Sequence, residues 1–374
     1  MRLARGLLNA VLALAVASGL ANPAHAHGIA GAVYTMDNSP HGNRVLVFAR
    51  AADGTLTADG SFETGGLGTG TGLGSQGALV PSSNERWLFA VNAGSDEISA
   101  FEVEPSGLSL VDRVPSGGRR PISLTVHDDL LYVLNAGGAA GDSDNITGFR
   151  LDDEGHLAPI AGSMRPLSAA STGPAQIQFE WGGRVLVVTE KATNLIDTYT
   201  IDEEGLATGP VSFPSPGQTP FGFDSGKRNQ IFVSEAFGGA PDASAVSSFL
   251  VSRDGMLRVI SPSVPTRQTA ACWVVVTPDG RFAYASNTGS GTISGYRIGF
   301  DGSPALLQAD GRTADLGPGT EPIDMALSVN GRYLYVLNSG TGTIGAFRVN
   351  SDGTLAPLAA VGGLPTGTNG LAAR

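Results

Sequence analysis

The chain has 374 residues, a formal net charge of −11 at pH 7 and a single cysteine. The acidic balance argues against nucleic acids and anionic membranes as partners, because both are themselves negatively charged. One cysteine excludes an internal disulfide, so stability has to come from burial of the apolar residues, which make up 41% of the sequence.

Residues 1–26 have the features of a secretory signal peptide. Arg2 and Arg5 precede an apolar stretch from Leu7 to Leu20, and Ala24-His-Ala26 matches an A-x-A cleavage site. The apolar stretch is too short to span a bilayer. We therefore expect a mature chain that begins at His27, is not inserted in a membrane, and is periplasmic or extracellular.

A short apolar run that ends in Asn or Glu recurs along the rest of the chain. Its clearest copy is Tyr132-Val-Leu-Asn135, and from Asn92 onwards the copies recur every 43 to 55 residues. We call the final residue of each copy its anchor; the anchors are Asn38, Asn92, Asn135, Glu190, Glu235, Asn287 and Asn338. A repeat of this length accommodates four strands and cannot bury its own apolar face, so neighbouring repeats must pack on one another.

Turn residues divide each repeat into strands. In the last repeat we expect strands over 323–328, 333–337, 344–349 and 355–361, with tight turns at Asn330-Gly331 and Asp352-Gly353. The chain begins at a second strand, residues 31–36, and ends in a segment that is similar to a first strand. These features predict an all-β fold, with residues 27–374 forming a single seven-bladed β-propeller. The C-terminus should supply the innermost strand of the N-terminal blade.

Strand direction places the anchors on the face that also carries the links between blades, near the mouth of the central channel. Two successive blades have Glu where the others have Asn, and we therefore predict Glu190 and Glu235 as catalytic acid or base residues. Two alternatives stay open. The carboxylates could be solvated caps of their loops, or they could hold a divalent cation. No cofactor is otherwise predicted.

The same face carries positive charge. Arg120 and Arg267 lie in links between blades, and Lys191 follows Glu190. Cations at a channel mouth in an acidic protein suggest an anionic small molecule as ligand, so we predict these three residues as substrate-binding. Gln176 and Gln268, near the first strands of blades four and six, complete the predicted set. Cys272 should be a buried thiol, because no histidine is placed to activate it.

The repeats resemble the seven-bladed lactonase family that includes bacterial 6-phosphogluconolactonase and fungal carboxymuconate-lactonising enzyme. The resemblance covers nearly all of the mature chain and rests on strings such as TPDGRFAYASNTGSGTISGYRI and SVNGRYLYVLNSGTGTIGAFRV. It implies a polar role for Glu190 at the channel mouth, in acid/base chemistry or in orienting the substrate. The family's Gly-Pro-Arg-His sequence in blade four is here Gly173-Pro-Ala-Gln176, so its Arg-His pair is missing. Arg120 or Arg267 could replace the arginine.

The sequence therefore predicts a secreted, lactonase-like propeller that binds a small anionic lactone or sugar-derived ligand and, if it is an enzyme, hydrolyses it. The signal peptide argues against phosphogluconate chemistry, which is cytoplasmic. The alternative is a non-catalytic binding or scaffold propeller of the YVTN type, with a protein partner. Fold alone does not decide between them.

Overall fold

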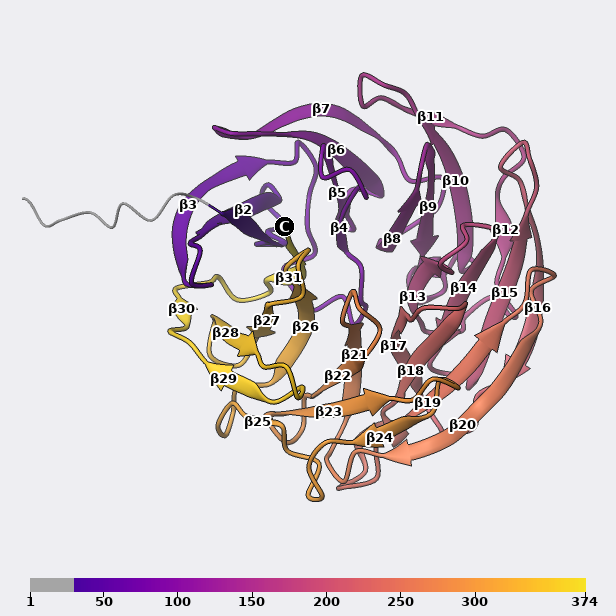
Figure 1. Cartoon of the computed structure of the whole chain (residues 1–374). Helices are drawn as coiled ribbons and strands as arrows, with labels where there is room; N and C mark the ends of the chain where they lie inside the picture. Colours follow the sequence, from indigo (N-terminus) through magenta and orange to yellow (C-terminus); the bar gives the residue numbers. More distant parts are fainter. Residues whose placement is uncertain (1–29) are drawn as a thin grey trace, which may run out of the picture.

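The computed structural model describes residues 30–374, which form a ring of seven antiparallel sheets around a central channel (Figure 1). The predicted signal peptide, residues 1–26, lies outside the described residues. The all-β class and the seven blades predicted from the repeats are confirmed. Within 30–374 the helical segments are two 3-10 turns, Gly137–Ala140 and Phe237–Gly239, and neither is long and apolar enough to cross a membrane.

Each blade has an inner strand at the channel, then a second, a third and an outer strand. The inner strands are β31 (Asn369–Ala373), β4 (Leu79–Pro81), β8 (Pro121–His127), β13 (Pro174–Phe179), β17 (Pro220–Ser225), β21 (Ala271–Val276) and β26 (Pro322–Leu327). The second strands are β1 (Gly31–Met36), β5 (Trp87–Asn92), β9 (Leu130–Asn135), β14 (Val185–Glu190), β18 (Gln230–Glu235), β22 (Phe282–Asn287) and β27 (Tyr333–Asn338).

The third strands are β2 (Arg44–Arg50), β6 (Glu97–Glu104), β10 (Asn145–Leu151), β15 (Leu195–Ile201), β19 (Ala245–Val251), β23 (Thr292–Ile298) and β28 (Thr343–Val349). The outer strands β3 (Leu56–Glu63), β7 (Gly107–Pro115), β16 (Ala207–Pro214) and β20 (Leu257–Pro265) are continuous. In the other three blades the outer strand is split into β11 (Leu157–Pro159) and β12 (Arg165–Pro166), β24 (Pro304–Leu306) and β25 (Ala314–Asp315), and β29 (Leu355–Pro357) and β30 (Val361–Gly362).

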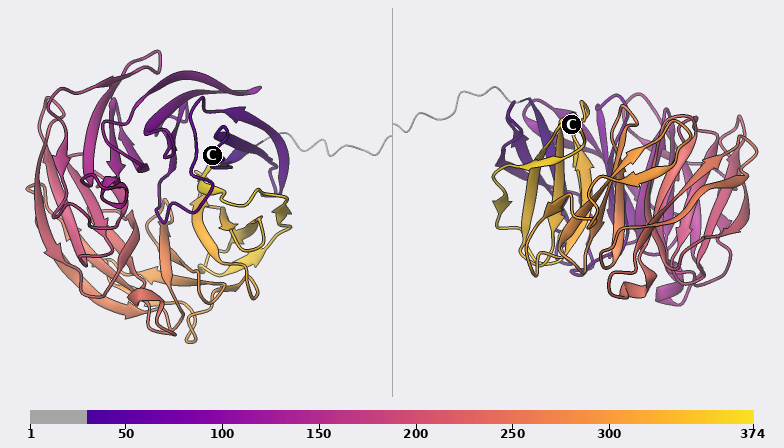
Figure 2. Two further views of the ribbon diagram at one scale, coloured as in Figure 1. Left: turned by 180° about the vertical axis from the view of Figure 1, so that it is seen from behind. Right: turned by 60° about the horizontal axis from the view of Figure 1, so that its bottom comes forward.

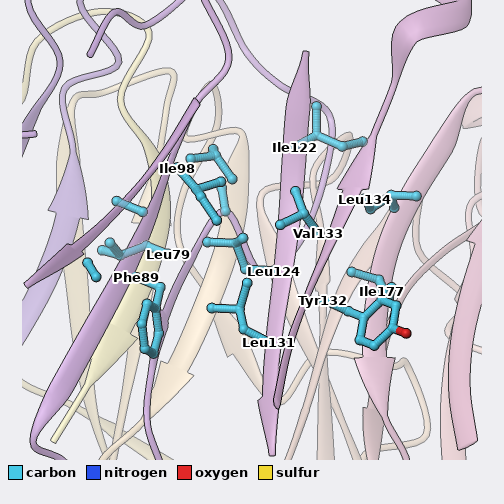
Figure 3. Close-up of a cluster of buried hydrophobic side chains, with 14 of the residues drawn as sticks. Leu79, Phe89, Ile98, Ile122, Leu124, Leu131, Tyr132, Val133, Leu134 and Ile177 are labelled. Atoms are coloured by element: carbon cyan, nitrogen blue, oxygen red, sulfur yellow. The ribbon is translucent and has the colours of Figure 1, made fainter. Parts of the chain in front are cut away.

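The second strands form the centre of the hydrophobic core. A neighbouring blade covers each of their two faces, and every residue of β5, β9, β14, β18, β22 and β27 is buried. This explains why the repeated phrase is a continuous apolar run rather than an alternating one. Figure 3 shows Phe89, Leu131 and Ile177 from successive blades in one such cluster. Full burial of one such side chain contributes about 1.5–3 kcal/mol.

Tyrosines of the repeated phrase link their blades to the next blade. The hydroxyl groups of Tyr132, Tyr284 and Tyr335 donate to the carbonyl oxygens of Gly205, Gly353 and Gly54 at 2.7, 2.8 and 2.9 Å. Gly353 lies in one of the predicted Asp-Gly turns and has φ +90°, and a Cβ there would come within 2.5 Å of the Phe282 ring. The turn therefore requires glycine both for its conformation and for this close approach.

The ring closes as the sequence predicts. The C-terminal strand β31 pairs antiparallel with β1, so the last residues of the chain form the innermost strand of the first blade. The Asp324 carboxylate of blade seven also accepts a 3.0 Å hydrogen bond from the backbone N–H of Leu371. Two kinds of contact thus hold the closing strand.

The connection between blades one and two crosses the channel, which the sequence did not predict. We call residues 72–77 the floor segment; the left view of Figure 2 shows this part of the chain near the centre of the ring. The Ser75 hydroxyl donates to the Ile122 carbonyl of blade three, and the Gln76 N–H donates to the Ala175 carbonyl of blade four. The Gln76 amide bonds both backbone groups of Val274 in blade six. The segment therefore bridges opposite walls of the channel.

Candidate functional site

Glu190 ends β14 and points into the space between blades three and four, where its side chain is 0% exposed. The backbone N–H and the hydroxyl group of Ser168 donate to it at 3.0 and 2.5 Å, and the Thr193 hydroxyl donates at 2.5 Å. Ser168 belongs to the link that leads into blade four. This carboxylate therefore ties the end of the second strand to that link.

Glu235 has the same relation to blade five, and it too is 0% exposed. It accepts hydrogen bonds from the Gly217 N–H at 2.9 Å and from the hydroxyl groups of Ser247 and Ser263 at 2.5 and 2.7 Å. Its donors lie in the link between blades four and five and on the strands of blade five. Because each glutamate lies in its own inter-blade space, the two do not form a joint carboxylate site.

The asparagine anchors explain why two blades carry Glu. The Asn92 amide donates to the Ser99 hydroxyl and the Asn287 amide donates to Ser294, while Asn92 Oδ1 also accepts from Asn43 and Thr64, so an amide here uses both its donor and its acceptor. Around Glu190 and Glu235 the links supply several hydroxyl and N–H donors, which a carboxylate satisfies better than an amide. The arrangement gives both residues a structural role; their predicted catalytic role stays a prediction.

Asp197 on β15 is the buried acid that sequence reasoning missed. It is 0% exposed, lies beside Glu190 and accepts a hydrogen bond from the Ser168 N–H at 3.1 Å, while its Oδ1 has no hydrogen-bond partner among the described residues. Burial, together with the neighbouring Glu190, raises the pKa of Asp197 to about 7. We therefore expect the two neighbouring carboxyl groups to share a proton at neutral pH. The corresponding third-strand positions bonded to Asn92, Glu235 and Asn287 are Ser99, Ser247 and Ser294, so an Asp at this position was the available signal.

Two of the predicted substrate-binding residues come together at the channel mouth. Lys191 is half-buried, its Nζ donates to the Gly74 carbonyl oxygen at 2.5 Å and lies 4.6 Å from the centre of the Phe221 ring. Burial, with a smaller contribution from the charge of Arg120, lowers the pKa of Lys191 to about 8. Among residues 30–374, neither cation forms an ion pair, and Arg120 Nε is buried without a hydrogen-bond partner.

Two aromatic side chains lie beside Lys191. The rings of Phe221 and Trp273 lie 4.9 Å apart, and the indole N–H of Trp273 donates to the Ser75 carbonyl oxygen at 3.0 Å. Cys272 is buried as predicted, and burial raises the pKa of its thiol to about 11. The thiol is therefore protonated at neutral pH, which is unfavourable for a nucleophile.

The other predicted binding residues lie elsewhere. The Gln176 amide spans the gap to blade five, with Nε2 bonded to the Phe223 carbonyl and Oε1 accepting from the Phe223 N–H at 2.7 Å. Gln268 is buried in its link, where it bonds Asp310 and Thr292. Arg267 is exposed. The structure thus brings Lys191 and Arg120 together and leaves the binding role of the other three as a prediction.

The family model described as "Lactonase, 7-bladed beta-propeller" matches residues 41–169 and 244–371, which is well over half of the chain. The chain belongs to this lactonase family. A 6-phosphogluconolactonase from Yersinia pestis (strain Pestoides F) is 24% identical over 280 residues, covering 72% of this chain and 79% of the relative. A similar relative from Yersinia enterocolitica is 24% identical over 275 residues.

Solved structures show the same fold. The periplasmic gluconolactonase of Pseudomonas aeruginosa superposes with a TM-score of 0.70 at 18% identity, over 91% of this chain and 98% of that one. A protein from Lactobacillus plantarum gives a TM-score of 0.72 at 16% identity, over 92% and 99%. The family match leaves out residues 170–243, which hold Gln176, Glu190, Lys191 and Glu235. The sector with the altered Arg-His sequence thus lies outside the matched residues.

The shared proton of Asp197 and Glu190 leads to a prediction for Asp197→Asn. Because the folded pKa of Asp197 lies above the ordinary value of 3.8, its contribution to stability is fully present below about pH 4 and is lost as the pH rises through about 7. The variant is neutral at every pH, and its amide can donate to Glu190. Relative to wild type, it should gain about 2 kcal/mol in free energy of unfolding between pH 5 and pH 8.

Urea unfolding at both pH values measures this difference. The control is Asp153→Asn, which removes an exposed carboxylate of blade three. It should leave the pH dependence of the free energy of unfolding unchanged. Parallel pH profiles for wild type and Asp197→Asn would contradict the shared proton.

Proposed function

We propose that this lactonase-family propeller binds a small anionic lactone, or the sugar acid formed from it, at the channel mouth. One observation supports this most directly: Lys191 and Arg120 are close enough to interact, are half-buried, and lack a carboxylate partner within residues 30–374. Two neighbouring cations repel each other, and a bound carboxylate or phosphate would remove that repulsion and satisfy Arg120 Nε.

Aromatic rings beside the cations suit a sugar-derived ligand. Phe221 and Trp273 offer apolar surface for the ring of a lactone, while Lys191 and Arg120 hold its charged group. In ring opening, the same cations would stabilise the negative charge that develops on the lactone carbonyl oxygen. The names of the relatives from Yersinia and Pseudomonas support a lactone as the substrate class.

A direct binding measurement tests this site. We expect 6-phosphogluconate to bind the purified protein in isothermal titration calorimetry, and we expect Lys191→Met and Arg120→Met each to weaken binding about tenfold or more. The reason is that each removes one charge-assisted hydrogen bond, worth roughly 1.5–3 kcal/mol. Arg119→Met is the matched control, because Arg119 is exposed and lies 3.8 Å from Asp96. Equal losses in all three variants, or unaltered binding in the first two, would overturn the proposed site.

A second candidate function is a propeller that binds such a ligand without hydrolysing it. The complete burial of Glu190 and Glu235 favours it, because neither predicted acid or base can touch a ligand in this structure. Hydrolysis would need another base, or water reaching a buried carboxylate.

Opening of 6-phosphoglucono-1,5-lactone, the anionic lactone that yields 6-phosphogluconate, followed by proton release, separates the two candidates. If the protein is a lactonase with Glu190 as its acid or base, Glu190→Gln lowers the rate about 100-fold or more while the melting temperature stays within a few degrees of wild type. Glu235→Gln provides the parallel comparison in the next blade. Binding without turnover by the wild-type protein would instead establish the second candidate.

We also propose that the protein works in the periplasm or outside the cell. The signal-peptide features of residues 1–26 support this location, and a structural neighbour is named a periplasmic gluconolactonase. Mass spectrometry of the protein isolated from the extracytoplasmic fraction should find a mature N-terminus at His27. A chain that keeps Met1 and stays in the cytosolic fraction would contradict the proposal.

A further inference from the structure

We propose that the floor segment forms the inner wall of the mouth site and that Gln76 is its positioning residue, holding Lys191 in place through the backbone of residues 74–76. This inference rests on the proposed function, because it assigns a role toward the same cation. It goes beyond that proposal in naming an element from another blade as part of the site.

The first step of the argument is the contact between the floor segment and the site. Lys191 donates to the Gly74 carbonyl oxygen at 2.5 Å, and Trp273 donates to the carbonyl of the next residue, Ser75, at 3.0 Å. The cation and the aromatic ring therefore both bond to consecutive backbone groups of this segment. Any shift of the segment along the channel moves both of them.

The second step is the way the segment is held. Gln76 Nε2 donates to the Val274 carbonyl at 2.7 Å, and Gln76 Oε1 accepts from the Val274 N–H at 3.1 Å. The Ser123 hydroxyl donates to the Gln76 carbonyl oxygen at 2.7 Å. The Gln76 side chain thus bonds the segment to blade six, while its backbone carbonyl bonds it to blade three, so the segment is fixed on both sides of the channel.

The third step is the fit of the opposite wall. A Cβ at Gly222 would lie 2.1 Å from Gln76 Oε1, so the amide occupies space that only a glycine leaves free. Gly222 lies on β17 between Phe221 and Phe223, next to the aromatic ring of the site. The channel wall is thus shaped to receive this one side chain.

The test measures the state of Lys191 without any ligand. Competitive acetylation with acetic anhydride at a series of pH values, followed by mass spectrometry, gives the pH midpoint of Lys191 reactivity. In Gln76→Leu, which keeps the bulk but removes both amide bonds, the floor loosens and Lys191 gains water. The midpoint should then rise by about one pH unit toward the ordinary value for lysine. Trp273→Phe, which removes the indole N–H together with part of the ring, should shift it in the same direction.

Thr125→Val is the control for a general loss of stability. Its hydroxyl accepts a 3.0 Å hydrogen bond from the Phe179 N–H, which joins two inner strands, and among the described residues it makes no hydrogen bond to the floor segment. We expect it to lower the melting temperature and leave the Lys191 midpoint unchanged. An unchanged midpoint in folded Gln76→Leu and Trp273→Phe, or an equal shift in Thr125→Val, would overturn the positioning role. Failure of 6-phosphogluconate to bind the wild-type protein would refute the proposed function and leave this midpoint result standing.

Discussion

The structure depends on how the channel edge of each inner strand is satisfied. An inner strand pairs with only one neighbour in its blade, so its other edge presents unpaired backbone N–H groups to the channel. Side chains of the preceding blade accept hydrogen bonds from these groups. Ser123 and Thr125 accept from Ile177 and Phe179, Gln176 from Phe223, Asp224 from Val276, and Asp324 from Leu371. The blades are therefore joined by polar contacts at the channel as well as by apolar packing further out.

This use of polar side chains decides which residues remain for a ligand. Asp224 and Asp324 face the channel, but both oxygens of each accept backbone N–H groups, and burial raises the pKa of Asp324 to about 7. Their contribution is to hold strands together. Lys191 and Arg120 differ because they carry charge at the mouth without an ion-pair partner in residues 30–374. The candidate site is therefore identified by charged side chains that lack an ion-pair partner, and not by polar side chains whose hydrogen bonds are already satisfied.

Periodicity and turn chemistry were enough to predict the ring, the strand order and the closure by the C-terminal strand. They rest on local rules, because an apolar run buried on both faces and an Asp-Gly turn look alike in every blade. The surroundings of Glu190 could not be predicted in this way. Its burial depends on Ser168 in a link and on Asp197 in the next strand, and their convergence on Glu190 is set by how the strands and blades pack. The position of the floor segment could not be predicted either, because a Gly-rich loop has no periodic pattern that would indicate that it enters the channel.

In blade four, Gln176 stands where the resemblance implies a histidine, and its side chain holds two strands together. Where the resemblance implies an Arg-His pair, this chain has Ala175 and Gln176, and the Gln176 amide bonds both backbone groups of Phe223. Gln76 makes the same pair of bonds to Val274 on the far side of the channel. Two glutamines thus clamp inner strands on either side of Phe221 and Trp273, the aromatic pair beside Lys191. Because Lys191 bonds to the segment that one of these clamps holds, the geometry of its charge depends on the same edge contacts that hold the ring together.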